Sequence, residues 1–482
     1  RFWRSLNLSA KMRLPASIHS RYNPRREAER YINSLNLSED TEYFLLIEPG
    51  EGYLAEVLQN KFPYTKILIL HAGKGWPSRP GLPVWEPDSN MGIQDFLERE
   101  IPDTEAGKLK IVEWRPAFSF YGEAYREVLA ETVEFIKRID ANTKTIRGFG
   151  KRWFKNFFKN LLLPEQLVFY REISCPVLVT APGPGLEASL ESIKKIKKTG
   201  RVFTIAVSSS VLTLLCAGIV PDLVISTDGG GWALLHLYEA LRFIQSPPYG
   251  LAASLSAALP SQCSACPQIL IADGSRWQRH VLEKLGLPHI SFPQRGTVSA
   301  SALDLAFFLK KEKVYAAGID LKNSGIKTHA RPYSFERLIR EQASRMKSEY
   351  SLAFERSHAL ERGGSHNIYA SWFSRHSWPG KVLPLGRDSA FGSDEGDTNL
   401  QNLKKEAAAS GPPETEYFTI KEAGEKRKEK AKAFLLDALR DKENGAEIQG
   451  ELGSLLQLNS REEGEIYAAV ETLIRTGENV RG

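Results

Sequence analysis

The chain has 482 residues, of which 42% are hydrophobic and 25% charged, and this composition excludes collagen-like, mucin-like and wholly disordered proteins. At roughly 100–200 residues per domain, the length predicts several domains. The formal net charge of +6 is too dilute over this length for a protein dedicated to binding nucleic acid, so no nucleic-acid partner is expected. Four cysteines exclude a disulfide scaffold and suit a reducing compartment, which predicts a cytoplasmic protein.

The first part of the chain shows the pattern of a nucleotide-binding type of fold. Apolar runs at 43–47 and 66–70 flank a turn with two glycines and an apolar helix pattern, which together predict a βαβ unit. Residues 1–145 are therefore predicted to form a Rossmann-like domain. The aromatic and basic segment 146–172 has an amphipathic pattern and predicts a helical bridge.

The central part, residues 173–395, alternates strand and helix patterns. This alternation predicts a mainly parallel, doubly wound α/β sheet. Strands are expected at 176–180, 202–207, 223–227, 269–272 and 314–317, and helices at 186–196, 211–217 and 298–310.

The apolar stretch 202–225 is the longest in the chain, but serines interrupt it and a Pro-Asp pair lies within its second half. It predicts buried strand, helix and strand, and no membrane span is expected. Residues 325–385 look irregular. Residues 396–413 are rich in small and polar residues and predict a linker, and residues 414–482 predict a C-terminal helical region with a charged, solvated face.

Three acidic residues follow predicted strands, and ligands of open α/β sheets bind outside the carboxyl ends of the strands. These residues are Asp228, Asp273 and Asp320. Asp228 could hold a ribose hydroxyl, a base amine or a divalent cation, and its alternative role is a solvated turn acid beside three glycines.

Two turns before predicted helices could contact an anion. Gly183, Pro184 and Gly185 follow a strand, and the next helix would offer its N–H groups and dipole to a phosphate. The pattern is neither a Walker A loop nor GxGxxG, so a plain tight turn is the alternative. Gly296 and Thr297 precede the second helix, where Thr297 could contact a phosphate or only cap the helix.

Two further residues are candidates for the site. Ser208 begins a serine triplet that can cap the following helix, and it is also a candidate nucleotide contact. His329 lies nine residues after Asp320, a distance that lets the loop fold back over the strand ends. Its imidazole could act as general base or acid, or donate to a phosphate, and the alternative is an ordinary surface histidine.

Cys263 and Cys266 form a CxxC pair without a second pair elsewhere. A structural zinc site usually needs more ligands, so neither a metal site nor a redox site is expected here.

The ordered set of motifs resembles the motility accessory factor (Maf) flagellin glycosyltransferases, which belong to the superfamily of the 6-hydroxymethylpterin diphosphokinase MptE-like domain. The matching segments are Ile18–Pro24 (IHSRYNP), Ala181–Leu186 (APGPGL), Ile205–Val207, Leu215–Asp222, Ser226–Asp228, Gly296–Ala306 and Gly318–Ala330. One position departs from the pattern, because Gly185 stands where the family has serine, so a hydroxyl contact to phosphate is lost there.

The resemblance implies a sialyltransferase-like central domain that transfers a nonulosonic acid from a CMP-activated donor to Ser or Thr of flagellin. It implies that the Gly183–Gly185 turn cradles the donor phosphate and that Asp228 lies by the nucleotide. Asp320 and His329 would line the reaction centre, with His329 as base or phosphate partner. Such chemistry requires that the acceptor hydroxyl lose a proton while the leaving phosphate is stabilised.

Two alternatives remain open. An MptE-like 6-hydroxymethylpterin diphosphokinase would use ATP and Mg²⁺, for which Asp228 and Asp320 are suitable ligand types. A non-catalytic flagellin-binding protein would instead depend on the basic aromatic segment and the charged tail. Under the glycosyltransferase reading, no cofactor is firmly implied.

Overall fold

The computed structural model describes residues 18–476 with short gaps, and it divides into two compact units, Arg1–Gly148 and Phe149–Gly482. The division falls within helix α5 (Glu123–Asn160). The gaps are 39–40, 77–80, 102–107, 245–246, 294, 363–368, 371, 374–375, 387–388, 393–394, 442–444 and 459–462.

The first unit contains a parallel four-stranded sheet with the strand order β3-β2-β1-β4. The two predicted apolar runs form its centre, since a strand buried on both faces must be apolar throughout. The strands are β1 (Tyr43–Ile47), β2 (Lys66–Leu70), β3 (Val84–Trp85) and β4 (Leu109–Glu113), and the helices before α5 are α1 (Pro24–Ser34), α2 (Tyr53–Lys61), α3 (Ile93–Glu100) and α4 (Arg115–Tyr121).

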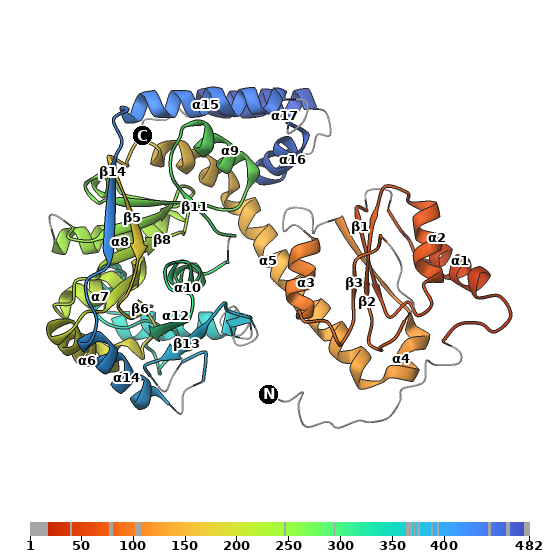
Figure 1. Ribbon diagram of the computed structural model, residues 1–482, viewed down its shortest axis with the longest axis horizontal. Coiled ribbons are helices and arrows are strands. Elements are labelled where there is room, and N and C mark those ends of the chain that lie inside the picture. The colour runs from red at the N-terminus through yellow and green to blue at the C-terminus, as the bar shows by residue number, and fades with distance from the viewer. Residues whose placement is uncertain are drawn as a thin grey trace. The chain divides into compact units, whose positions relative to one another are not determined.

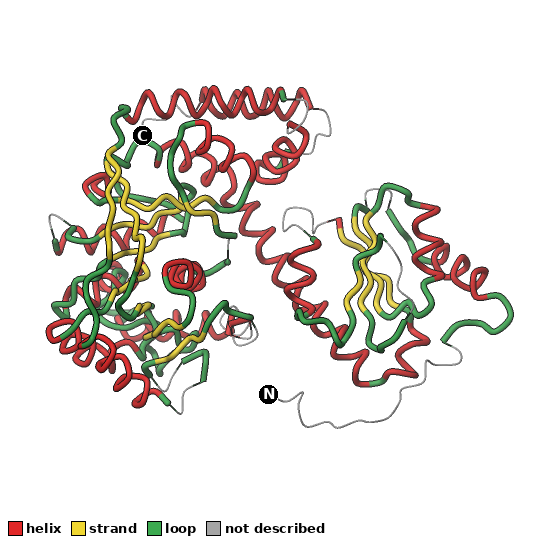
Figure 2. Tube along the Cα trace, in the orientation of Figure 1, coloured by secondary structure: helices red, strands yellow, loops and turns green. Residues whose placement is uncertain are grey.

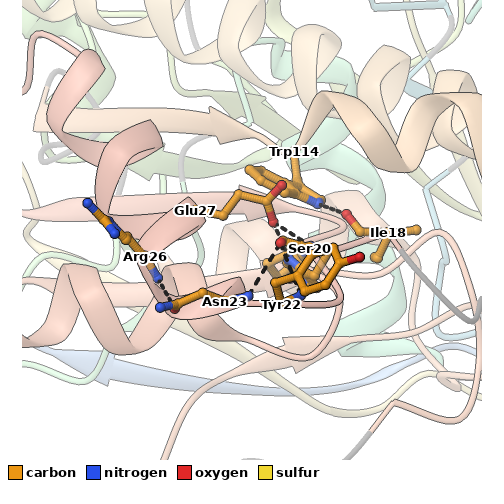
Figure 3. A network of polar contacts seen from close by, with 9 residues as sticks. Ile18, Ser20, Tyr22, Asn23, Arg26, Glu27 and Trp114 are labelled. Atoms are coloured by element: carbon orange, nitrogen blue, oxygen red, sulfur yellow. Dashed lines mark hydrogen bonds and ion pairs between the residues drawn. The ribbon is translucent and has the colours of Figure 1, made fainter.

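The segment that enters this unit is fixed by local hydrogen bonds (Figure 3). The Ser20 N–H donates to Glu27 Oε2 at 2.8 Å, and the Asn23 side chain caps the first turn of α1. The Trp114 indole N–H donates to the Ile18 carbonyl at 2.9 Å. The His-Ser…Asn-Pro motif therefore orders the start of α1, because it satisfies N–H groups that a helix leaves unpaired.

The second unit is built on a larger sheet with the order β13-β12-β6-β7-β8-β9-β10-β5-β14, and β11 adds to β10. Its strand pairs are parallel except for β14 against β5, which confirms the predicted mixed α/β fold with a mainly parallel sheet. The strands are β5 (Gln166–Glu172), β6 (Val177–Thr180), β7 (Phe203–Val207), β8 (Leu223–Ser226), β9 (Gly250–Ser254), β10 (Gln268–Ala272), β11 (Ile290–Ser291), β12 (Lys313–Ala317), β13 (Lys381–Pro384) and β14 (Glu414–Thr419).

Helices cover both faces of this sheet (Figures 1 and 2). Alternate residues of the central strands enter two separate cores, one shared with α6, α7, α8 and α14, the other with α10. The helices are α6 (Leu186–Thr199), α7 (Val211–Cys216), α8 (Leu234–Phe243), α9 (Arg276–Lys284), α10 (Val298–Leu309), α11 (Glu336–Gln342), α12 (Glu349–Arg362), α14 (Gly396–Ala408), α15 (Gly424–Arg440), α16 (Gly445–Leu456) and α17 (Glu463–Thr476), with 3₁₀ turns η3 (Ser208–Ser210), η4 (Gly231–Ala233) and η5 (Ser261–Ala265).

The order of the strands creates one reversal in the winding of the sheet. The chain proceeds from β6 through β7, β8 and β9 to β10, and α10 then returns it to β12 on the other side of β6. The connections that leave β6 and β12 therefore run in opposite directions. At such a switch point the carboxyl ends of the two strands border a crevice, which is where doubly wound sheets bind ligands.

Two predicted segments differ from the structure. The helical bridge 146–172 is helical only to Asn160, and Gln166–Glu172 is strand β5, because its Leu-Val-Phe-Tyr run is apolar and aromatic as strands require. The prediction of a linker at 396–413 is wrong as well, since Gly396–Ala408 forms helix α14. Its buried residues Asn399, Leu403 and Ala407 recur every four residues, which is the spacing of one helix face.

The C-terminal region also contains an element that the sequence did not predict. Residues Glu414–Thr419 form strand β14, which adds antiparallel to β5 at the edge of the sheet. The rest is helical as predicted, and α15, α16 and α17 share a core with α9 and the end of α5. Within the described ranges, no helix combines the length and apolarity needed to cross a membrane.

Arg427 of α15 is expected to contribute strongly to the stability of this region. Its buried guanidinium donates to the carbonyls of Leu161, Pro164 and Glu422 at 2.8–2.9 Å. We expect Arg427→Met to lower the free energy of unfolding by about 3 kcal/mol, because buried carbonyls lose a charged donor. Lys426→Met, one residue away and exposed, should change it by less than about 0.5 kcal/mol. Urea unfolding of both variants measures this difference, and equal stabilities would contradict it.

Candidate functional site

The turn after β6 is fastened to the end of β12 by backbone hydrogen bonds. The Ala181 N–H donates to the Ala317 carbonyl and the Gly183 N–H to the Gly318 carbonyl, both at 2.8 Å. Gly318 has a φ of +74°, a conformation that favours glycine. These bonds continue the ladder between β6 and β12 beyond the strands and bring the two predicted motifs together at the switch point.

The carboxylate of Asp320 lies directly against this turn. Its Oδ2 accepts the Gly185 N–H at 2.5 Å, and the side chain is 7% exposed. A Cβ atom at Gly183 would lie 2.5 Å from Asp320 Oδ2, and one at Gly185 would lie 2.9 Å from Asp320 Oδ1. The two glycines are therefore required so that the carboxylate can approach the backbone.

This arrangement revises the predicted phosphate cradle. The Gly183 and Gly185 amides already donate within the chain, and Pro184 has no N–H. The anion that contacts the turn in the structure is the side chain of Asp320, whereas the sequence predicted a donor phosphate there. Any donor phosphate must therefore be met by groups beyond these three residues.

The loop that carries His329 is fixed on the N-terminal turn of α6. The Ala330 N–H donates to the Pro182 carbonyl at 2.7 Å, and the Arg331 N–H donates to Glu187 Oε1 at 2.9 Å. Lys327 Nζ lies 2.8 Å from Glu187 Oε2. The loop thus folds back to the end of β6, and His329 is held next to the switch point.

His329 lines a cavity of about 470 Å³, a volume within the usual range for small-molecule sites. The walls combine arginine, glutamate and tyrosine side chains from the loop, α11 and α12. The lining residues are Ile326, Thr328, His329, Arg331, Pro332, Tyr333, Glu336, Ile339, Arg340, Glu349, Tyr350, Ala353 and Arg356.

The imidazole of His329 is oriented by two neighbours. Its Nδ1 lies 2.9 Å from Thr328 Oγ1, and its ring is stacked on Tyr333 with centroids 5.1 Å apart and planes 7° apart. Burial raises the pKa of the Tyr333 phenol, so this ring stays neutral near physiological pH. The histidine therefore faces the cavity with a restricted ring orientation.

Glu336 is a cavity residue that the sequence did not identify. Burial raises the pKa of its carboxyl group, while the nearby Arg331 and Arg340 act in the opposite direction. Its Oε1 lies 3.4 Å from Arg331 Nε, and no hydrogen bond to it exists among the described residues. This carboxyl group therefore holds a proton more readily than an exposed carboxyl group does.

The other two strand-end acids have structural partners. Asp228 is exposed, and its Oδ1 accepts the Gly230 N–H at 2.7 Å in a local turn. Asp273 Oδ1 accepts from the Ser275 N–H and hydroxyl, and Oδ2 accepts from Gln278 Nε2 at 2.7 Å. Asp273 therefore orders the start of α9, and Asp228 matches the turn-acid alternative.

The remaining predicted residues also lie at helix starts. Thr297 Oγ1 accepts the Ala300 N–H at 3.2 Å and caps α10, and Gly296 precedes it with a φ of +72°. Ser208 is buried in η3, whereas Ser210 donates its hydroxyl to the Thr180 carbonyl at 3.0 Å. The serine triplet thus ties η3 to the end of β6.

The predicted site residues consequently fall into separate places. Asp320 and His329 lie around the β6–β12 crevice, whereas Asp228 follows β8, three strands from β12. At about 4.8 Å per strand, that separation is roughly 14 Å, too large for one Mg²⁺ ion to be bound by both acids. Among the described residues, no three acidic, histidine or cysteine side chains are grouped as metal ligands.

The CxxC pair lies in the core. Cys263 and Cys266 are both buried, and burial raises the pKa of each thiol to about 12. Such thiols are protonated at physiological pH and therefore poor nucleophiles.

Residues 151–325 match the family model described as 6-hydroxymethylpterin diphosphokinase MptE-like. The match confirms the resemblance to that superfamily for the centre of the chain, and it contains the Gly183–Gly185 turn and Asp320. It ends just before Ile326, where the residues that line the cavity begin.

Two uncharacterized proteins of Treponema pallidum (strain Nichols) are also similar. One is 31% identical over 247 residues, which cover 51% of this chain and 53% of that protein, so the chain spans about half its length. The other is 23% identical over 212 residues, or 38% of this chain and 68% of that protein. A solved structure of a Maf glycosyltransferase from Magnetospirillum magneticum AMB-1 aligns with 95% of this chain and 82% of its own at 11% identity, with a TM-score of 0.42.

The sequence missed the residues of α11, of α12 and of the loop before α11 that complete the cavity. Tyr333, Glu336, Tyr350 and Arg356 fall in the segment that looked irregular, because no regular apolar spacing marks it. The cluster of charged and aromatic residues after His329 was the available signal.

The contact between the glycine turn and Asp320 predicts a strong effect of a single methyl group. In Gly183→Ala the new Cβ would lie 2.5 Å from both Asp320 Oδ2 and the Gly318 carbonyl oxygen. We expect a loss of about 2–4 kcal/mol in the free energy of unfolding, because backbone cannot move away as a flexible side chain can. The control is Gly386→Ala, whose new Cβ has no atom within 4 Å. Thermal unfolding compares the two, and an equally stable Gly183→Ala would contradict the contact.

The buried His236 of α8 should make the stability of the protein depend on pH. Its pKa is lowered to about 4, mainly by burial and to a smaller extent by the positive charge of Arg356. The unfolded chain then binds the proton more readily, so this stability is present above pH 6.5 and is lost as the pH falls toward 4. Between pH 7 and pH 5 the loss should be about 2 kcal/mol. Urea unfolding at both pH values should show a smaller loss in His236→Gln, and an unchanged loss would exclude His236 as its source.

Proposed function

We propose that this protein is a glycosyltransferase that moves a nonulosonic acid from a CMP-activated donor to a Ser or Thr hydroxyl of flagellin. The observation that carries the proposal is the cavity of about 470 Å³ in which His329 faces arginine and tyrosine side chains beside the switch point. Tyrosine rings offer apolar surfaces to a sugar or base, and arginines suit an acidic sugar and a phosphate.

His329 is the proposed proton-transfer group. The acceptor hydroxyl must lose a proton when its oxygen attacks the sugar, and the phosphate of CMP must leave with the bonding electrons. An oriented imidazole at the cavity wall can accept that proton or donate a hydrogen bond to the leaving phosphate. Its contact with Thr328 and stacking on Tyr333 support this role by limiting the orientations of the ring.

Asp320 is proposed as a positioning residue of the same centre. It binds the turn after β6, and the His329 loop is attached to that turn through Ala330. The nucleotide contacts proposed for Asp228, Asp273, Ser208, Gly296 and Thr297 are the weaker part of the proposal, because their described contacts are structural.

The alternative is a 6-hydroxymethylpterin diphosphokinase, which the description of the matched family favours. The chain offers no joint Mg²⁺ site at Asp228 and Asp320, so any ion would be held differently from the prediction. The residues that line the cavity begin at Ile326, outside the matched range. We therefore expect the substrate to be selected by side chains that the family model does not contain.

The two activities are separated by one set of incubations. The protein is given labelled CMP-nonulosonate with flagellin, or ATP with 6-hydroxymethylpterin, each with and without EDTA. Sugar transfer to flagellin supports the proposal, and pterin diphosphate formation overturns it in favour of the kinase. Flagellin binding without any turnover supports the non-catalytic alternative.

Replacement of His329 tests its role directly. We expect His329→Ala to lower kcat about 10²–10⁴-fold with a small change in KM, because proton transfer rather than binding is removed. His280→Ala on α9 is the control, since His280 is not among the cavity-lining residues, and it should retain wild-type kcat. A fully active His329→Ala enzyme would exclude this residue as base or phosphate partner.

A further inference from the structure

The three arginines that line the cavity differ in whether a carboxylate lies within ion-pair distance of them. Two of its arginines face carboxylates, since Arg331 Nε lies 3.4 Å from Glu336 and Arg340 Nε lies 3.7 Å from Glu349. Arg356 lines the same cavity, and among the described residues no carboxylate lies within ion-pair distance of it. The cavity therefore contains one positive charge that the described part of the chain leaves uncompensated.

Two aromatic rings hold this guanidinium in place. The Arg356 Cζ atom lies 4.8 Å from the centroid of Phe335 and 5.7 Å from that of Tyr333. Rings attract a guanidinium through their faces but do not neutralise its charge, and its N–H groups remain suited to a planar anion. Tyr333 also stacks on His329, so one ring links the cation to the proposed proton-transfer residue.

The charge of Arg356 also acts on a second neighbour. His236 lies edge-on to Phe335 at 5.1 Å, and Arg356 is the second cause, after burial, of its lowered pKa. His236 therefore stays neutral near physiological pH and adds no positive charge beside Arg356.

We propose that Arg356 is the specificity residue that recognises the anionic group of the sugar donor, a carboxylate or a phosphate. This inference rests on the proposed function and names the donor chemistry that the cavity selects. A donor without a negative charge would leave the guanidinium without an ionic partner. The expected consequence is discrimination against neutral ligands of the same shape.

The test is calorimetric binding with probes of defined charge. CMP carries only the phosphate, N-acetylneuraminic acid carries only the carboxylate, and cytidine carries neither. The wild type should bind CMP or the sugar acid at least about tenfold more tightly than cytidine, which corresponds to a charge-assisted contact. The probe that loses affinity in the variant identifies which anion Arg356 meets.

The variants separate this role from general charge. Arg356→Met should weaken binding of that probe about tenfold or more and abolish its preference over cytidine, while Arg356→Lys should retain part of it. Arg337→Met, which removes an exposed arginine of α11 that pairs with Glu239 and Glu341 and does not line the cavity, should stay within about threefold of wild type. Circular dichroism of each variant confirms that it is folded.

The outcomes also separate this inference from the proposed function. If the wild type binds ATP instead of the CMP probes and Arg356→Met loses that binding, the glycosyltransferase proposal fails while the anion role of Arg356 is supported. If folded Arg356→Met binds every anion as tightly as wild type, or if wild type binds none of them, the role of Arg356 is overturned.

Discussion

The contact between the Asp320 carboxylate and the backbone of the Gly183–Gly185 turn determines how the candidate site is arranged. It joins the carboxyl ends of β6 and β12, and a charge-assisted hydrogen bond of this kind contributes about 1.5–3 kcal/mol. The turn in turn accepts the Ala330 N–H through Pro182, so the position of His329 depends on it. A carboxylate in a glycine turn therefore orders a loop whose histidine lies on the wall of the cavity.

This constraint explains why the crevice is not itself the ligand pocket. In many doubly wound sheets, the first turn after a strand leaves its amides to a phosphate. Here Asp320 accepts the Gly185 N–H and the Gly318 carbonyl accepts the Gly183 N–H, so an added phosphate would face a negative charge as well as paired donors. The positive groups lie instead on α12 and the loop before α11, where Arg356 and Arg331 line the cavity. Under the proposed function, these side chains would meet the anionic donor in place of the backbone of the sheet.

The parts of the fold that the sequence predicts are those governed by burial on both faces. Strands such as Tyr43–Ile47 and Phe203–Val207 are continuous apolar runs because both faces are covered, and no other element explains such runs. Strand β14 could not be predicted in this way, since all its residues are exposed and only its pairing with β5 makes it a strand. Helix α14 was not predicted because most of its residues are polar or small, although its buried residues recur every four positions.

The candidate site likewise contains features that the sequence predicts and features that it does not. The return of His329 to the strand ends was predictable from the short distance along the chain to Asp320. The pairing of Asp320 with Gly185 was not, because 135 residues separate them and only the strand order brings them together. Likewise, the local sequence does not show that Arg340 pairs with Glu349 while Arg356 has no carboxylate partner in the part of the chain that the structure describes, since this depends on how α11 and α12 pack.

The boundary of the family match bears on which part of the molecule selects the substrate. The matched residues 151–325 supply the sheet, the glycine turn and Asp320, whereas the cavity is lined from Ile326 onward. A scaffold of this kind positions a reacting group but leaves the shape and charge of the pocket to the loops and helices that follow it. Under the proposed function, the charge and aromatic character of residues 326–356 would select the substrate. Arg356, which has no carboxylate partner among the described residues, lies beside the stacked His329 and Tyr333, and under our proposal it would select an anionic donor.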